Sequence, residues 1–163
     1  MKDDSLRTQL VKLLTGEQAH MRFEEAVADF PEKYYNTKPP HVSYTPWHLL
    51  EHIHITQKDI LDFILVDGYK EKKWPADYWP KKTEKADKKK WGTSIKRFIA
   101  DTKALQKIVR DPKRDILALL PWGEPYTIFR EIVVVGNHNS YHIGEFAVLR
   151  EVMQTWPKNR KNS

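Results

Sequence analysis

Residues 133–146, VVVGNHNSYHIGEF, place two histidines four positions apart inside an apolar run. Apolar residues continue at helical spacing on both sides, which predicts a helix that begins near Thr127 and runs through Val152. His142 falls on the apolar stripe of this helix, one turn after His138, where a leucine would pack better. A buried imidazole needs a polar partner, and the partner has to come from another part of the chain.

Three more segments repeat apolar residues with the period of a helix, over residues 4–28, 45–67 and 91–109. Thr45 is expected to cap the second of these helices, and Pro46 suits its first position. No stretch alternates convincingly with period two, so little sheet is expected. Four amphipathic helices of this length predict an all-α protein with the fold of a four-helix bundle.

The long connection between the second and third helices, residues 66–85, constrains their order. A loop of this length can span the bundle, so these two helices are expected to run parallel in an up-down-down-up arrangement. Trp74 and Trp79, each followed by a proline, are expected to pin the loop against the bundle. The bundle domain would cover residues 1–156, followed by a basic C-terminal tail at residues 157–163.

Composition limits the class of protein. The 163 residues are 40% hydrophobic and 31% charged, as expected of one globular domain with a proper core. The chain has no cysteine, which excludes disulfides and thiolate metal ligands. No apolar run approaches ~20 residues, which argues against a transmembrane helix. The charged first residues lead into no apolar signal segment, so a cytoplasmic location is expected.

The formal net charge of +6 raises the alternative of a nucleic-acid-binding protein. The excess positive charge lies in a lysine-rich segment at residues 70–90 and in the tail at residues 158–161. No basic recognition helix, RNP-type aromatic strand or zinc-finger spacing accompanies it. A solvated surface is therefore the favoured interpretation, and binding to nucleic acid is not expected.

The predicted helices place the histidines differently. His52 lies on the inward stripe of the second helix, His48 about 40° from it around the axis, and His54 about 200° from it, on the other side. A spacing of four lets His138 and His142 approach one point. His52, on a facing helix, would complete a site of three nitrogens.

A site of three neutral imidazoles suits zinc, nickel or ferrous iron rather than calcium or magnesium. Three protein ligands also leave coordination positions open, as catalytic metal sites do. Gly136 and Gly144 flank the histidine pair and are expected to admit a neighbouring helix or a ligand closely. Relief of packing alone is the alternative explanation for these glycines.

Three segments carry a resemblance to the DinB-like (YfiT-related) superfamily of bacterial helical-bundle proteins: TPWHLLEHIHITQKDILDFI (45–64), WPADYWP (74–80) and NHNSYHIGEFAVLRE (137–151). The resemblance covers nearly the whole chain. The pattern of that family places a tryptophan five residues before a histidine of the second helix, which Trp47 and His52 match. Its pair of histidines on the last helix matches His138 and His142, so all three metal-ligand positions of the family are present.

The resemblance implies a four-helix bundle with a long second connection, and frequent homodimers. In better characterised relatives it implies metal-dependent transfer of low-molecular-weight thiols, or metal-dependent hydrolysis. We therefore expect a divalent-metal-dependent enzyme that acts on small molecules, with the three matching histidines as ligands. His20, His48 and Glu145 are candidate groups around the metal or the substrate.

Other enzyme classes find little support. A zinc protease needs a glutamate directly after the first histidine of the pair, and the chain has Asn139 there. No serine stands in a glycine-flanked elbow, and no glycine-rich loop is present to hold phosphate. The remaining alternative is a non-catalytic metal-binding module or a dimeric interaction module.

Apolar residues off the main stripe of the last helix, Val133, Val134, Ala147 and Val148, are more than one buried face needs. A helix that is apolar around much of its circumference needs a second partner. The first and last helices are therefore expected to form a homodimer interface, the alternative being a central position in the bundle.

Overall fold

The computed structural model describes residues 2–16, 18–123 and 125–157. Within them it holds five α-helices and two short 3-10 turns: α1 (Lys2–Thr15), α2 (Phe23–Val27), η1 (Glu32–Tyr34), α3 (Pro46–Leu65), η2 (Ala76–Tyr78), α4 (Lys88–Arg110) and α5 (Ile128–Val152). No strand occurs among these residues beyond one isolated bridge between Leu119 and Thr127. The predicted all-helical bundle is confirmed. Apart from Pro157, the predicted basic tail lies outside the described residues.

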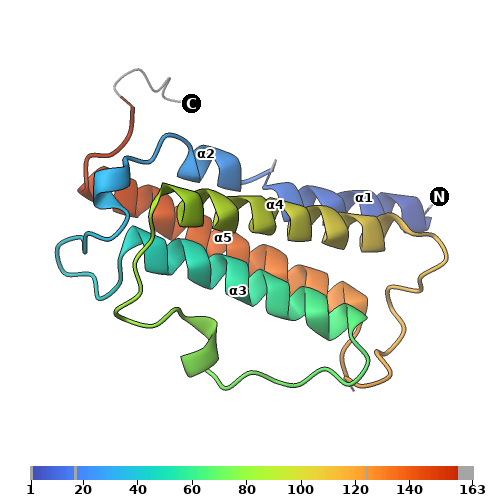
Figure 1. The fold of residues 1–163 in the computed structure, drawn as a ribbon. Coiled ribbons are helices and arrows are strands. Elements are labelled where there is room, and N and C mark those ends of the chain that lie inside the picture. Colours follow the sequence, from blue (N-terminus) through green and yellow to red (C-terminus); the bar gives the residue numbers. More distant parts are fainter. Residues whose placement is uncertain (1, 17, 124, 158–163) are drawn as a thin grey trace.

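The four long helices lie side by side, with α3 packed on α4 and α5, and α1 packed on the same two helices. Figure 1 shows α1 and α5 running from right to left, and α3 and α4 from left to right. The connection from α3 to α4 crosses the length of the bundle along its lower edge (Figure 1). Each helix in the described part of the chain is too short or too polar to cross a membrane.

The helix starts follow from side-chain caps. Thr45 precedes Pro46, and its hydroxyl accepts a hydrogen bond from the backbone N–H of His48, as expected from the sequence. The His48 ring returns the bond by accepting from the Thr45 backbone N–H at 3.4 Å. Thr127 caps α5 in the same way, at 3.1 Å. These caps fix the start of α3 and α5, the two helices that carry the candidate ligands.

The single first helix expected over residues 4–28 is wrong, because the chain breaks into α1 and α2 there. Gly16 adopts φ +73°, a left-handed conformation that glycine allows and that ends α1. Arg150 of α5 holds the second piece: its guanidinium is fully buried and donates to the carbonyls of Ala26 and Ala28 at 2.9 and 2.6 Å. The periodicity continued across the break because both pieces pack on the same core.

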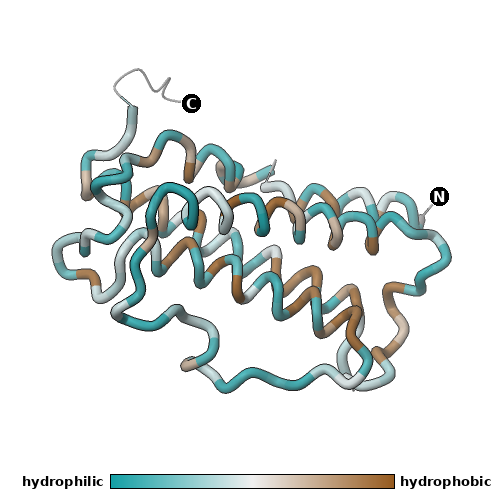
Figure 2. Tube along the Cα trace, viewed as in Figure 1, coloured by the Kyte–Doolittle hydropathy of each residue, from teal (hydrophilic) through white to brown (hydrophobic). Residues whose placement is uncertain are grey.

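Two apolar clusters fill the bundle. One, rich in aromatic rings, lies near the start of α3 and includes Trp47, Trp91 and Phe146. The other is largely aliphatic and lies toward the end of α3, with Leu105 and Ile132 at its centre. Figure 2 shows that apolar positions recur along each long helix between polar ones, as amphipathic helices require.

A polar layer lies between these clusters. Gln57 of α3 is fully buried, donates to the carbonyl of Phe98 at 2.8 Å, and accepts from Asn139 of α5 at 2.8 Å. Because the Gln57 amide bonds to both α4 and α5, the three helices α3, α4 and α5 are held in one register. The polar layer lies level with the candidate ligands, since Asn139 directly follows His138.

The two glycines of α5 differ. A Cβ at Gly136 would lie 2.6 Å from Cγ of Leu13, so this glycine admits the close approach of α1 that the sequence predicts. A Cβ at Gly144 would meet no described atom within 4 Å, so the expectation of a closely packed neighbouring helix is wrong there. Gly144 lies instead on the exposed side of α5.

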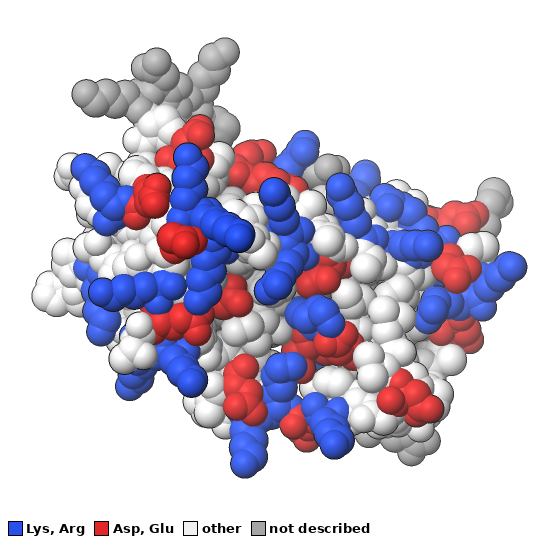
Figure 3. All heavy atoms as spheres, in the orientation of Figure 1, with Lys and Arg blue, Asp and Glu red and all other residues white. Residues whose placement is uncertain are grey.

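The charged surface is mixed. Figure 3 shows lysine and arginine side chains interspersed with aspartate and glutamate over the face in view. Several of them are paired, as in the contact of 2.8 Å between Lys90 and Glu84 within the lysine-rich segment. Such pairs leave less unbalanced charge than the sequence count of that segment implies.

Candidate metal centre

Three histidine rings converge between α3 and α5. Nε2 of His52 lies 3.2 Å from Nε2 of His138 and 3.2 Å from Nε2 of His142. One ring nitrogen from each residue lies within 4.8 Å of the other two, which makes this a group that could hold a metal ion. His52 is buried and the other two are partly buried. The structure thus brings together the three residues that the sequence selected.

The other nitrogens of two of these rings have fixed roles. Nδ1 of His52 lies 2.8 Å from the carbonyl oxygen of Tyr78, and because a carbonyl only accepts, Nδ1 carries the proton and donates. Nδ1 of His142 lies 2.6 Å from Oε2 of Glu145 and donates to that carboxylate. In a neutral ring the remaining nitrogen, Nε2, is then a bare lone pair. Two bare lone pairs therefore face each other across 3.2 Å.

That arrangement fits a divalent cation. Lone pairs at such a distance repel, and they form no hydrogen bond with each other unless a proton is added. Zinc–nitrogen bonds of about 2.0–2.1 Å at tetrahedral angles separate two ligand nitrogens by about 3.3–3.4 Å. The observed separation lies close to that value. The donor set and its spacing therefore fit a bound zinc or nickel ion.

The surroundings favour neutral imidazoles, the form that binds metal. Burial lowers the pKa of His138 to about 4, with help from the neighbouring rings of His142 and His52. Burial also lowers the pKa of His52 and outweighs the hydrogen bond to the carbonyl of Tyr78, which acts in the opposite direction. At neutral pH both rings are uncharged and keep a lone pair for a metal.

Glu145 is held on both sides. One carboxylate oxygen accepts from His142, and the other accepts from the hydroxyl of Tyr44, which precedes α3. Burial alone would raise the pKa of Glu145, but the hydrogen bonds from His142 and Tyr44 outweigh it and lower that pKa. Burial and the bond to Glu145 raise the pKa of the Tyr44 phenol, which stays protonated as a donor.

The loop between α3 and α4 closes the site from one side. The indole of Trp79 stacks on the His52 ring with centroids 3.9 Å apart and planes within 2°. The expectation that Trp79 pins the loop is therefore met. Trp74 is 72% exposed and packs on Tyr78 within the loop, so the same expectation is wrong for Trp74.

Two other sequence candidates have structural roles instead. His48 belongs to the cap of α3, and its Nε2 lies 3.1 Å from the carbonyl of Glu84. His20 lies in the loop after α1, not on the expected helix, and its ring contacts Ser140 at 2.8 Å. Of the three groups that the sequence suggested around the site, only Glu145 contacts one of the three converging histidines.

His54 points away from the converging rings, as its helical phase predicts, yet it is buried. Its two ring nitrogens lie 3.6 Å from carboxylates of Glu51 and Asp101. Because α4 covers that side of α3, a substitution of His54 would disturb the packing of these two helices. His54 is therefore a poor control for substitutions at the site.

Sequence analysis missed the partners that orient the ligands. Tyr44 lies in an irregular segment with no periodicity to reveal its direction. The Tyr78 carbonyl is a backbone group, invisible to residue patterns, although its segment WPADYWP is one of the three that carry the family resemblance.

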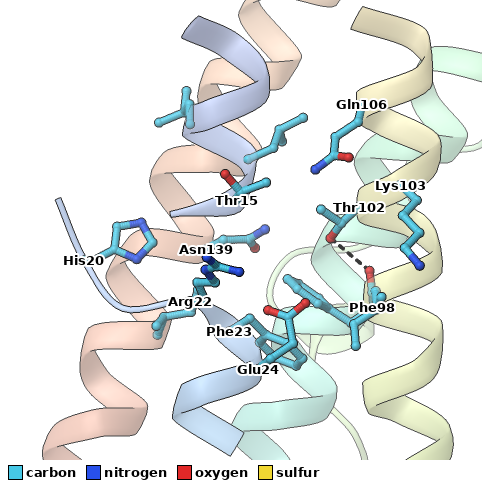
Figure 4. Close-up of a pocket in the computed structure, with 14 residues that line it drawn as sticks. Thr15, His20, Arg22, Phe23, Glu24, Phe98, Thr102, Lys103, Gln106 and Asn139 are labelled. Carbon is cyan, nitrogen blue, oxygen red and sulfur yellow. Dashed lines mark hydrogen bonds between the residues drawn. The ribbon is translucent and has the colours of Figure 1, made fainter. Parts of the chain in front are cut away.

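A separate cavity of about 130 Å³ lies where α1 ends and α2 begins. Figure 4 shows Thr15, Thr102, Gln106 and Asn139 around it, from α1, α4 and α5. None of the three converging histidines lines this cavity. It is thus distinct from the candidate metal centre.

The comparisons with known proteins agree with the geometry. The sequence model of the DinB superfamily matches residues 15–146, which is most of the chain. The matched span contains all three converging histidines together with Tyr44, Tyr78 and Glu145. No curated protein and no solved structure matches the chain significantly.

Proposed function

This chain belongs to the DinB superfamily, and from that premise we propose that it is a divalent-metal-dependent enzyme acting on small molecules by thiol transfer or hydrolysis. The observation that carries the proposal is the convergence of the Nε2 atoms of His52, His138 and His142. In His52 and His142 the proton lies on Nδ1, so that Nε2 has a lone pair free for a metal. Zinc or nickel suits these ligands best, and ferrous iron also suits them.

Three protein ligands leave coordination positions for a further small ligand. A divalent ion held there would act as a Lewis acid, which would deprotonate a bound thiol or lower the pKa of bound water to near neutrality. The chain has no cysteine, so a thiol would have to come from a small molecule. A low-molecular-weight thiol is the substrate we propose for the transfer reaction.

The surrounding residues prepare the ligands. Glu145 accepts the Nδ1 proton of His142, which fixes the tautomer and makes the opposite nitrogen more basic. Tyr44 donates to the other oxygen of that carboxylate and holds it in place. Trp79 covers one face of the His52 ring and keeps water away from it. The coordination positions that the three histidines leave open are then available to the substrate.

Cobalt substitution tests whether the site has open positions. In the cobalt-loaded protein, azide or a small thiol such as 2-mercaptoethanol should change the visible spectrum by binding to the ion. The variant His138→Ala, treated with cobalt in the same way, should show neither the parent spectrum nor the change. A parent spectrum that ignores both ligands would favour the non-catalytic metal-binding module.

We also propose a homodimer, supported by an exposed stripe on α5. Val133, Tyr141, Val148 and Val152 are 39, 69, 63 and 52% exposed and lie at helical spacing. Asn137 and Gly144 complete the stripe, and the charged residues of this face, Arg130 and Glu151, lie at its two ends. Such a surface suits a second copy of the chain.

Light scattering at micromolar concentration tests the dimer. The wild-type chain should give the mass of two chains. Val148→Glu should give the mass of one chain, because burying an unpaired carboxylate in an apolar interface costs more free energy than the dimer contact gains there. A monomeric wild-type protein would refute the dimer and leave the metal site, which lies within one chain, unaffected. The cytoplasmic location expected from the sequence stays a prediction.

A further inference from the structure

A groove of about 620 Å³ lies beside the three histidines, toward the far end of α3, and none of the three lines it. Thr56, one turn after His52, lines its α3 side, and Val134, one turn before His138, lines its α5 side. Tyr78 lines it too, and its carbonyl is the one that accepts from His52. The groove therefore adjoins the candidate metal centre through these three residues, and its volume is typical of a small-molecule site.

Six aromatic residues line the groove. They come from α3, from the connection between α3 and α4, and from the segment before α5: Phe63, Tyr69, Trp74, Tyr78, Trp122 and Tyr126. The rings of Tyr69 and Tyr126 meet Phe63 edge-on at 5.1 and 5.9 Å. The indole N–H of Trp122 donates to the carbonyl of Phe63 at 2.7 Å, which holds that ring in place.

The acidic groups deep in this groove are already paired. Asp59 is buried and accepts hydrogen bonds from Tyr69, Tyr78 and Lys72 at 2.7 to 2.9 Å. These three donors occupy both oxygens of the carboxylate, and the charge of Lys72 offsets that of Asp59. Asp59 therefore orders the aromatic wall and offers no charge to a ligand.

The second buried carboxylate is paired as well. Glu131 is 3% exposed and lies 2.7 Å from the guanidinium of Arg130. The same guanidinium lies over the ring of Tyr126, 4.4 Å from its centroid. With its buried acids and its arginine engaged, the deep part of the groove has little free charge with which to select an ion, and the remaining lining carboxylate, Glu71, is exposed to solvent.

One buried polar atom of the groove has no partner among the described residues. It is the hydroxyl oxygen of Thr56, in a residue only 7% exposed. A buried hydroxyl without a hydrogen bond is costly, and a ligand that bonds to it recovers that cost. Thr56 lies at the end of the groove next to His52, so a ligand bonded there lies beside the metal centre.

From these contacts we propose that the groove binds the body of the substrate as a flat, uncharged aromatic group that carries one hydrogen-bonding atom for Thr56. The proposal rests on the proposed function, because it takes the three histidines as the reacting end of the site. Aromatic walls favour a ring in offset or edge-on contact. The paired carboxylates favour a neutral ring over a charged one, since a charge would be buried without a partner.

Three naphthalene probes test this chemistry on the full chain: naphthol, which is uncharged at pH 7, naphthoate, an anion, and naphthylmethylammonium, a cation. Nitrogen-resolved NMR follows the indole N–H signals. Naphthol should shift the signal of Trp122, and leave that of Trp91, which is buried in the other cluster, in place. Naphthol should also bind at least about tenfold more tightly than either ion. Equal or tighter binding of an ion, or no shift of Trp122, would overturn the proposal.

Two variants locate the bound probe. Trp74→Ala removes an exposed wall residue that the fold does not need, and should weaken naphthol binding about fivefold or more. Leu117→Ala, an exposed apolar change outside the groove, should not weaken it. Thr56→Val should weaken naphthol about three- to tenfold but leave naphthalene, which has no hydroxyl, unchanged. Equal affinities in wild type, Trp74→Ala and Thr56→Val would place the probe elsewhere.

Measurements of naphthol binding and of metal binding distinguish a failure of this inference from a failure of the proposed function. Naphthol binding is measured in metal-free wild type and in His138→Ala, where the groove remains intact. Naphthol binding in a chain that takes up no divalent metal would support the groove and refute the metal-dependent enzyme. Metal binding without naphthol binding would refute the groove alone.

Discussion

Replacing Glu145 tests how the candidate ligands are prepared. Its carboxylate accepts from Nδ1 of His142 at 2.6 Å, and its side chain is 27% exposed, so solvent screens this contact only in part. In Glu145→Gln an amide oxygen still accepts the proton but the charge is lost. Hydrogen bonds to charged groups contribute about 1.5–3 kcal/mol and neutral ones about 0.5–1.5 kcal/mol. The difference of about 1–1.5 kcal/mol corresponds to roughly tenfold weaker zinc binding.

Glu145→Ala removes the acceptor altogether, so His142 is free to rotate or to change tautomer. Its zinc affinity should fall by up to about 100-fold, the upper range for groups that orient metal ligands. Titration of zinc against a chromophoric chelator at pH 7 measures both variants. Glu151→Gln, an exposed change on the same helix, serves as control. Wild-type affinity in Glu145→Gln, or equal affinities in the Gln and Ala variants, would refute this role.

Three further predictions concern stability. Because the pKa of His138 is lowered to about 4 and that of His52 is also lowered, the unfolded chain binds more protons between about pH 4 and 6.5. The free energy of unfolding of the metal-free protein should therefore fall by about 1–2 kcal/mol from pH 7 to 5 in urea titrations, and His138→Ala should reduce that fall. Gly136→Ala, whose Cβ would meet Leu13 at 2.6 Å, should destabilise the protein by about 1–2 kcal/mol. Gly92→Ala in α4, with no described atom within 4 Å, should stabilise it by about 0.5–1 kcal/mol in the same assay.

Periodicity predicted the long helices because each buries one stripe in a shared core. It failed between α1 and α2, where Met21 and Val27 keep the helical spacing although Gly16 ends the first helix. The left-handed backbone at Gly16 depends on φ, and a pattern of apolar residues carries no information about φ. The cap at Thr45 was predictable because it acts within one turn of its own helix, and the start of α5 near Thr127 was predicted from the apolar spacing alone.

The three histidines could be selected because helical phase alone determines which residues face inward. Helical phase could not separate a group beside the metal or the substrate from a helix cap. His48 was therefore predicted beside the site, whereas its ring bonds to the backbone of Thr45. Helical phase predicted correctly that His54 points away from the site. It did not predict that His54 is buried, because the burial comes from a neighbouring helix, α4, whose Asp101 lies beside the ring. Partners contributed by loops, such as Tyr44, depend on chain paths that no local pattern encodes.

Metal analysis of the untagged protein tests the central claim most directly. After loading with zinc and removal of free metal, mass spectrometry should find about one zinc ion per wild-type chain, and none in His138→Ala. His41→Asn is the control, because His41 is exposed and its φ of 61° suits asparagine. That variant should keep the zinc. A wild-type chain without bound metal, or a His138→Ala chain with its zinc intact, would contradict the assignment of His52, His138 and His142 as the metal centre.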